Sequence, residues 1–210
     1  MGKTEHYHTK FEYGNFYHIY NRSIDKQPLF KSEANFKFFL KKYNEYLSPV
    51  IDTYAYCLLG NHFHILIRIK EEQELPSSKE LTINSDSGER SVHNIISHQF
   101  KKFFQSYAMA FNKQHQRVGT LFQTPFKRAL VTNDAYFTQL IYYIHANPQH
   151  HDLIADFRKW QWSSYDSILS DKPSKIRKSE VIKWFGNKQA YETYHDSLQK
   201  VMLDDKLALD

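Results

Sequence analysis

The chain has 210 residues, of which 41% are hydrophobic and 24% are charged. This composition is typical of a folded globular protein and excludes wholesale disorder. There are 28 Lys and Arg against 23 Asp and Glu, giving a formal net charge of +5, and the one cysteine excludes an internal disulfide and a cysteine-based zinc site. We expect no signal peptide, because no apolar run follows the basic Lys3, and no membrane-spanning helix, because no apolar run approaches ~18 residues. The expected location is the cytoplasm.

Aromatic residues make up 16% of the chain, and the basic residues are concentrated in one part of it. Residues 91–188 carry 14 Lys and Arg against 6 Asp and Glu, a net charge of +8, whereas the rest of the chain has a net charge of −3. Because bases stack on aromatic faces and phosphates attract cations, this combination favours a nucleic-acid partner. An aromatic core beneath a solvated basic surface would give the same composition.

Two periodicities predict the secondary structure: alternation for strands and 3.6-residue spacing of apolar side chains for helices. In chain order we expect a strand over 15–22, a helix over 33–46 capped by Ser32, strands over 53–59 and 63–70, a loop over 71–90, a helix over 91–114, an extended segment over 121–131, a helix capped by Asn133 or Asp134 that runs to Pro148, and a final Tyr-rich helix.

This order, in which a hairpin is flanked by helices, predicts an α+β fold with a ferredoxin-like antiparallel sheet flanked by helices. We expect one domain over residues 1–168. Residues 169–210 would form a basic and then helical C-terminal extension.

His62 and His64 are the first candidate functional pair. His62 directly precedes the strand expected over 63–70 and His64 lies within it, so both share one face, while the apolar Phe63, Ile65 and Ile67 face the other way. Two residues of strand rise place the imidazoles ~7 Å apart, which allows both to reach one divalent ion. Two structural histidines would satisfy the same pattern.

Tyr143 and Asn147 are the second candidate pair, near the end of the helix expected before Pro148. Residues four apart lie on the same helical face, so the phenol and the amide would point the same way. The amide oxygen of Asn147 is a hard, neutral ligand of the kind that divalent ions accept. An ordinary core aromatic and a helix-terminal cap would account for the same two residues.

Three sequence blocks resemble those of a known family. They are Leu59-Gly-Asn-His-Phe-His64, Gly119-Thr-Leu-Phe-Gln-Thr-Pro-Phe-Lys127 and Tyr142-Tyr-Ile-His-Ala-Asn-Pro148. In this order they resemble the single-tyrosine HUH transposases. Two further blocks, Tyr17-His-Ile-Tyr-Asn-Arg22 and Trp162-Ser-Ser-Tyr165, are similar to the REP-associated tyrosine transposase branch, and the match covers about residues 15–168.

The resemblance implies an HUH nuclease fold that cleaves and transfers single-stranded DNA, often with a hairpin. By position, His62 and His64 would bind the metal and Asn147 would be the third ligand. Tyr143 would be the nucleophile, and Tyr142 points ~100° away on the helix. The implied cofactor, Mg²⁺ or Mn²⁺, would polarise the scissile phosphate. Attack by Tyr143 would leave a 5′-phosphotyrosine and a free 3′-OH, so joining would need no ATP.

Basic side chains would hold the DNA through its phosphates. The candidates are Lys101, Lys102, Lys127, Arg128, Lys175, Arg177 and Lys178. Phe122 and Phe126 would either stack on unpaired bases or belong to the core. The resemblance leaves monomer and homodimer both open. The rival function is a non-catalytic module that binds single-stranded DNA or RNA on the same fold, with the two histidines purely structural.

Overall fold

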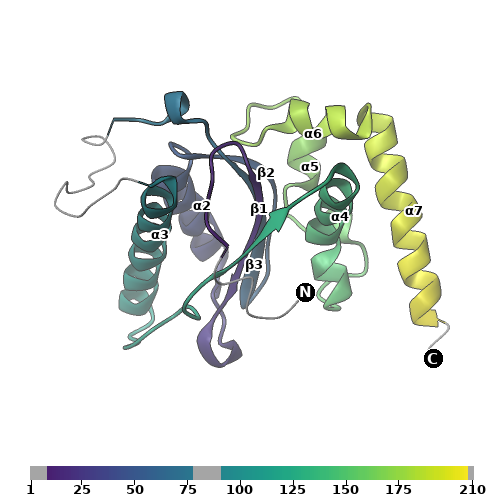
Figure 1. Cartoon of the computed structure of the whole chain (residues 1–210). Helices are drawn as coiled ribbons and strands as arrows, with labels where there is room; N and C mark the ends of the chain where they lie inside the picture. Colours follow the sequence, from purple (N-terminus) through teal and green to yellow (C-terminus); the bar gives the residue numbers. More distant parts are fainter. Residues whose placement is uncertain (1–8, 78–90, 208–210) are drawn as a thin grey trace.

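The computed structural model describes residues 9–77 and 91–207 (Figure 1). In chain order the elements are β1 (Phe16–Arg22), η1 (Ile24–Lys26), α2 (Glu33–Leu47), β2 (Ile51–Leu58), β3 (His62–Ile69), η2 (Glu72–Glu74), α3 (Val92–Gln114), β4 (Lys127–Val131), α4 (Asp134–His150), η3 (Phe157–Lys159), α5 (Tyr165–Leu169), α6 (Lys178–Phe185) and α7 (Lys188–Leu207). Among the described residues, no helix combines the length and the apolar character needed to cross a bilayer.

The four strands form one antiparallel sheet in the order β2-β3-β1-β4. This is the strand order of the ferredoxin-like βαββαβ unit, so the fold class predicted from the sequence is confirmed. The register brings the ends of three strands together. Tyr20 on β1 lies opposite His64 on β3 and Lys127 on β4, and Arg22 lies opposite His62.

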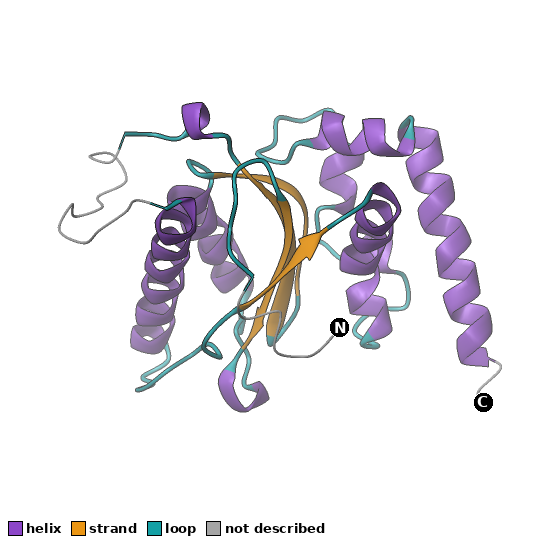
Figure 2. Cartoon of the chain, in the orientation of Figure 1, coloured by secondary structure: helices purple, strands orange, loops and turns teal. Residues whose placement is uncertain are grey.

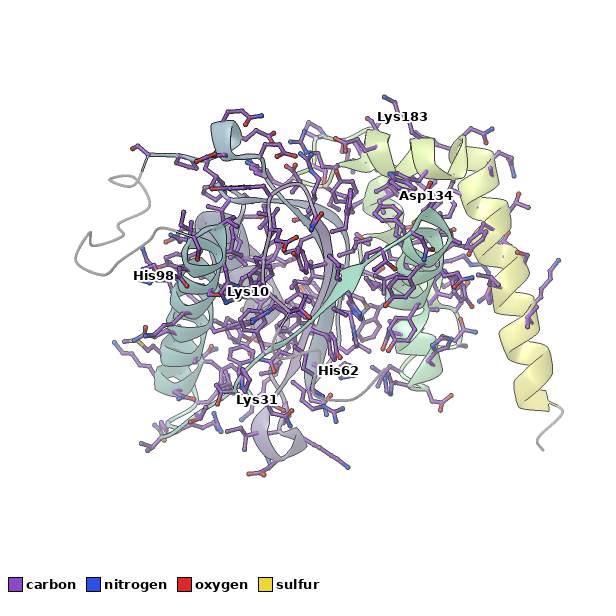
Figure 3. The ribbon with its side chains drawn as sticks, viewed as in Figure 1. Lys10, Lys31, His62, His98, Asp134 and Lys183 are labelled. Atoms are coloured by element: carbon purple, nitrogen blue, oxygen red, sulfur yellow. The ribbon has the colours of Figure 1, made fainter. Side chains whose placement is uncertain are left out.

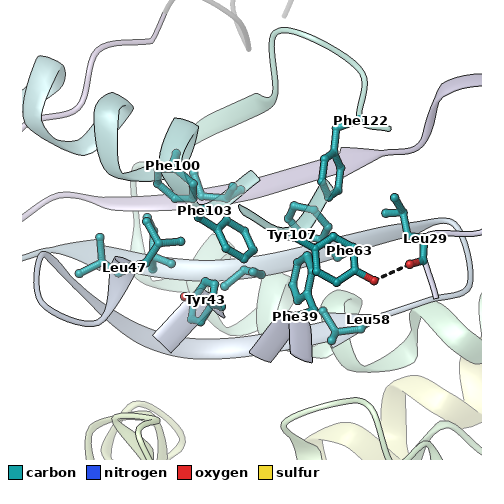
Figure 4. Packing of buried hydrophobic residues seen from close by; sticks show 14 of the residues in the cluster. Leu29, Phe39, Tyr43, Leu47, Leu58, Phe63, Phe100, Phe103, Tyr107 and Phe122 are labelled. Atoms are coloured by element: carbon teal, nitrogen blue, oxygen red, sulfur yellow. Dashed lines mark hydrogen bonds between the residues drawn. The ribbon is translucent and has the colours of Figure 1, made fainter. Parts of the chain in front are cut away.

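Helices cover both faces of the sheet (Figures 1 and 2). The helices α2 and α3 pack on one face, where Phe39, Phe63, Phe103 and Tyr107 form the centre of an aromatic core (Figure 4). Phe39 and Phe103 meet edge-on at 4.9 Å between ring centroids, the geometry that aromatic pairs prefer. The segment from α4 to α7 covers the other face.

The alternation of β3 decides what each of these faces receives. Phe63, Ile65 and Ile67 enter the core beneath α2 and α3, as predicted. Successive strand residues point to opposite faces, and the odd-numbered side chains are held by that core. His62 and His64 therefore face α4, and Leu66 continues the same row into the second core.

Several element boundaries differ from the prediction; the strand expected over 53–59, for example, spans Ile51–Leu58. The helix predicted to end at Pro148, α4, continues to His150. Pro148 and Gln149 are buried, so packing holds this last turn in place. The extended segment predicted over 121–131 forms a strand only from Lys127 onward. Most of the predicted loop over 71–90 lies outside the described residues, apart from its first part, which contains η2.

The segment expected as an extension packs directly against α4, and the expected boundary after residue 168 falls inside α5. A buried polar chain joins the two. His195 Nδ1 lies 2.8 Å from the Tyr191 carbonyl oxygen, and its Nε2 lies 3.1 Å from His145 Nδ1. His145 Nε2 in turn lies 2.8 Å from Ser164 Oγ. All of these side chains are inaccessible to solvent.

Candidate active site

A cavity of about 300 Å³ opens at the end of the sheet where β1 ends and β3 begins. It is lined by Tyr20, Asn21, Arg22, His62, Phe63, His64, Gln123, Lys127, Tyr143 and His151. His62, labelled in Figure 3, lies at this end of the sheet. The strand register explains why these residues lie together, since β1, β3 and β4 bring Tyr20, His64 and Lys127 to the same level of the sheet, and Arg22 lies opposite His62.

Hydrogen bonds leave the same nitrogen available on both imidazoles. His62 Nδ1 lies 2.7 Å from Asn61 Oδ1, and His64 Nδ1 lies 2.9 Å from His18 Nε2. The Nε2 atoms are therefore the ones that remain for a ligand. A histidine ligand commonly has its other ring nitrogen fixed by such a second hydrogen bond.

Both histidines are neutral at neutral pH. Burial lowers the pKa of His62 from 6.5 to about 4, with further lowering from His151 and Arg22. Burial also holds the pKa of His64 well below 6.5, and the neighbouring His18 and His62 act in the same direction. Neutral imidazole is the form that binds metal ions.

Tyr143 projects from α4 toward these two rings. Its side chain is 40% exposed, and its ring meets that of His64 edge-on at 5.5 Å between centroids. Tyr142 has the opposite environment. It is 8% exposed and packs against Phe157 and His195, and burial raises its pKa to about 12. Of the two tyrosines, only Tyr143 lines the cavity.

Asn147 lies between Tyr143 and His62. Its side chain is 1% exposed and donates from Nδ2 to the Tyr143 carbonyl oxygen at 3.0 Å. It also raises the pKa of His62, against the effect of burial. Because the amide nitrogen is engaged by that carbonyl, the amide oxygen is the atom that could serve as a ligand. Asn147 follows Tyr143 by one turn of α4, and this spacing lets its side chain reach the Tyr143 carbonyl oxygen.

By its chemistry this donor set could hold a divalent ion. It consists of two neutral imidazole nitrogens and one amide oxygen, a mixture that Mn²⁺ accepts readily and Mg²⁺ less so. Over residues 9–77 and 91–207, no cluster of three or more His, Cys, Asp or Glu is arranged to hold a metal ion. A metal here would therefore depend on Asn147 as well as on His62 and His64.

The predicted DNA-binding cations fall into two groups. Lys127 lines the cavity, and Lys101 lines a neighbouring groove that shares Asn21 and Gln123 with it. Lys102, one position along α3, lies over the Tyr46 ring at 5.6 Å.

Lys175, Arg177 and Lys178 lie at the other end of the sheet. The neighbouring Ile176 pairs with Thr53, and Thr53 lies opposite Ile67, five residues along β3 from His62 and ~16 Å away. Arg177 forms an ion pair with the buried Asp52 at 2.7 Å. Lys178 Nζ donates to the backbone carbonyl oxygens of Ser170 and Lys172, so these two cations are engaged within the protein.

Arg128 is not where a phosphate-binding residue was expected. It is 8% exposed, its guanidinium lies over the rings of Phe11 and Phe126, and it donates to the Thr9 carbonyl. On β4 its side chain points to the face opposite Lys127, which places it in the aromatic core. Phe122 is likewise 4% exposed and belongs to this core rather than to a base-stacking surface.

Three residues of β1 were not singled out in the sequence, although they line or support the cavity. His18, Tyr20 and Arg22 share one face of the strand and lie beside His62 and His64. The sequence over 15–22 alternates, and the polar or aromatic residue at every second position is the signal that could have identified them. His151, which follows α4, also enters the cavity, with its ring 4.9 Å from that of His62.

A solved structure described as a REP-associated tyrosine transposase bound to a REP hairpin superposes on this chain with a TM-score of 0.58. The two proteins share a fold. The alignment covers 82% of this chain and 89% of the transposase chain, at 13% sequence identity. The likeness at this identity concerns the fold. No profile of a known protein family matches the chain, and a search of curated proteins finds no match either.

Proposed function

We propose that this protein is a metal-dependent endonuclease and strand transferase that acts on single-stranded DNA bearing a hairpin. One observation carries the proposal: an exposed tyrosine, Tyr143, meets the neutral His64 edge-on in a cavity that also holds His62 and the cations Arg22 and Lys127. The fold shared with a hairpin-bound transposase supports DNA as the substrate.

His62, His64 and Asn147 would hold Mg²⁺ or Mn²⁺ in this site. When bound, the ion supplies Lewis-acid polarisation of the scissile phosphate and neutralises charge that develops on it. Arg22 and Lys127 would bind the non-bridging phosphate oxygens and stabilise the same charge. Arg22 is an addition to the cations expected from the sequence.

Tyr143 would act as the nucleophile. As its oxygen forms a bond to phosphorus, the phenol gives up its proton and the bond from phosphorus to the 3′ oxygen breaks. That oxygen takes up a proton and leaves as a free 3′-OH, while the 5′-phosphate remains on the tyrosine. A second 3′-OH can reverse the step, so strands are joined without ATP.

A labelling experiment tests the proposal. A hairpin-bearing single strand labelled at its 3′ end is incubated with the protein and Mn²⁺ and is separated on a denaturing gel. We expect a labelled protein band with the wild type and with Tyr142→Phe, the matched control, because Tyr142 lies outside the cavity. We expect no such band with Tyr143→Phe, with the double His62→Ala, His64→Ala variant, or in EDTA.

The outcomes separate the two candidate functions. An adduct formed by Tyr143→Phe, or mapped by peptide sequencing to another tyrosine, would refute the assigned nucleophile. Activity in EDTA would refute the metal role of His62 and His64. Tight DNA binding without an adduct under any metal would instead support the non-catalytic binding module.

A further inference from the structure

His18 lies beside His64 and does not itself line the cavity. It projects from β1, is 7% exposed, and its Nε2 atom lies 2.9 Å from Nδ1 of His64. The two rings are close to parallel, with an interplanar angle of 25° and 5.1 Å between centroids. His18 also meets the Tyr143 ring edge-on at 6.1 Å, so it contacts two of the groups proposed to take part in the reaction.

The hydrogen bond between these two imidazole nitrogens contains one hydrogen, and its position decides what His64 can do. A neutral imidazole carries its hydrogen on one nitrogen and a lone pair on the other. If Nδ1 of His64 carries the hydrogen, it donates to His18 and Nε2 of His64 is free to bind a metal. If His18 Nε2 is the donor, the hydrogen of His64 lies on its Nε2 and blocks that position.

His62 is fixed in a different way. Its Nδ1 atom faces the Asn61 side-chain oxygen, which can only accept, so His62 must donate and must keep its lone pair on Nε2. His64 has no such one-way partner at Nδ1, because the imidazole of His18 can either donate or accept. The ligand-competent form of His64 therefore depends on which tautomer its neighbour adopts.

We propose that His18 is a positioning residue that accepts a hydrogen bond from His64 Nδ1 and so holds His64 in the tautomer that presents Nε2 to a divalent ion. This inference rests on the proposed function, because it assigns His64 a role as a metal ligand. Partners of this kind fix ring orientation and tautomer, and their loss costs 10- to 100-fold in metal affinity.

Two substitutions of His18 separate hydrogen bonding from packing. His18→Gln offers an amide oxygen near the position of Nε2, whereas His18→Leu removes the acceptor and keeps an apolar side chain in the space. His93→Leu is the matched control, because His93 accepts a hydrogen bond from the Phe11 backbone and does not line the cavity.

Two measurements follow each variant. The ¹⁵N chemical shifts of the His64 ring in metal-free protein report its tautomer, and calorimetric titration with Mn²⁺ alone reports affinity. We expect the wild type, His18→Gln and His93→Leu to keep the hydrogen of His64 on Nδ1 and to bind Mn²⁺ within about threefold of one another. For His18→Leu we expect a mixed or reversed tautomer and Mn²⁺ binding that is about 10- to 100-fold weaker.

The results distinguish this inference from the proposed function. If His18→Leu keeps both the tautomer and the affinity of the wild type, the role of His18 is refuted whatever the DNA assay shows. A wild type that carries the hydrogen on Nε2 refutes it as well, even if His18→Leu does not fold. A wild type that binds Mn²⁺ with the expected tautomer but forms no DNA adduct refutes the proposed catalysis and leaves the role of His18 standing.

Discussion

Acidification from pH ~7.5 to pH ~5 is expected to destabilise the protein, because the buried His145 and His195 between α4 and α7 stay neutral when folded. Burial lowers the pKa of His195 from 6.5 to about 4 and holds the pKa of His145 well below 6.5. Between these values the unfolded chain takes up a proton that the folded chain does not. The free energy of unfolding is therefore highest above pH 6.5, falls as the pH drops below 6.5, and levels off below pH 4.

At pH ~5 the difference for His195 alone amounts to about 2 kcal/mol of unfolding free energy. His145, and the cavity histidines His62 and His64, act in the same direction. Carboxylates contribute little in this window. The pKa of Asp156, for example, lies below its ordinary 3.8 because of a hydrogen bond from Arg158, so this group stays ionised.

Urea unfolding followed by tryptophan fluorescence in EDTA measures the effect at the two pH values. The His195→Gln variant keeps a polar side chain but cannot titrate, so its loss of stability on acidification should be smaller than that of the wild type by about 2 kcal/mol. Equal stability at both pH values, or an unchanged pH dependence in His195→Gln, would refute the reasoning.

Three further predictions concern the sheet, the core and the DNA contacts. Asp52→Asn removes a carboxylate that is 5% exposed and pairs with two partly exposed arginines, and should lower the unfolding free energy by about 1–3 kcal/mol in urea titrations. Phe103→Ala empties a position with no solvent exposure in the aromatic core and should cost about 3–5 kcal/mol in the same assay; a loss below 1 kcal/mol would contradict the packing described. Affinity for single-stranded DNA should fall with salt, and Lys127→Ala should reduce the slope of log affinity against log salt by about one, while Lys175→Ala, at the far end of the sheet, should reduce it less. Equal effects of the two lysine variants would contradict the placement of the DNA.

The local part of the site could be predicted from the sequence because short-range periodicity determines it. Alternation over β3 places His62 and His64 on one face, since the apolar side chains between them must enter a core. A four-residue spacing on α4 likewise places Tyr143 and Asn147 on one face, and Tyr142 on another. These expectations need no knowledge of how distant segments meet.

The remaining features depend on long-range pairing, which a pattern in one segment does not specify. His18 and His64 are 46 residues apart, and only the β1–β3 register brings them into hydrogen-bond contact. Arg128 has the positive charge expected of a DNA-binding residue. Its burial depends on Phe11 and Thr9, more than a hundred residues earlier. The passage of α4 through Pro148 likewise depends on tertiary packing that overrides a local preference.

The helices after α4 contain neither the proposed nucleophile nor any proposed metal ligand, yet they bear directly on attempts to shorten the protein. The side of α4 opposite Tyr143 packs against Val181, Tyr191 and His195. A version shortened to residue 168 would leave that back surface facing water, and the front of the same helix carries Tyr143. The helices α6 and α7 thus maintain the position of the tyrosine relative to the sheet, and a shortened protein would have to retain them or replace them with an equivalent support.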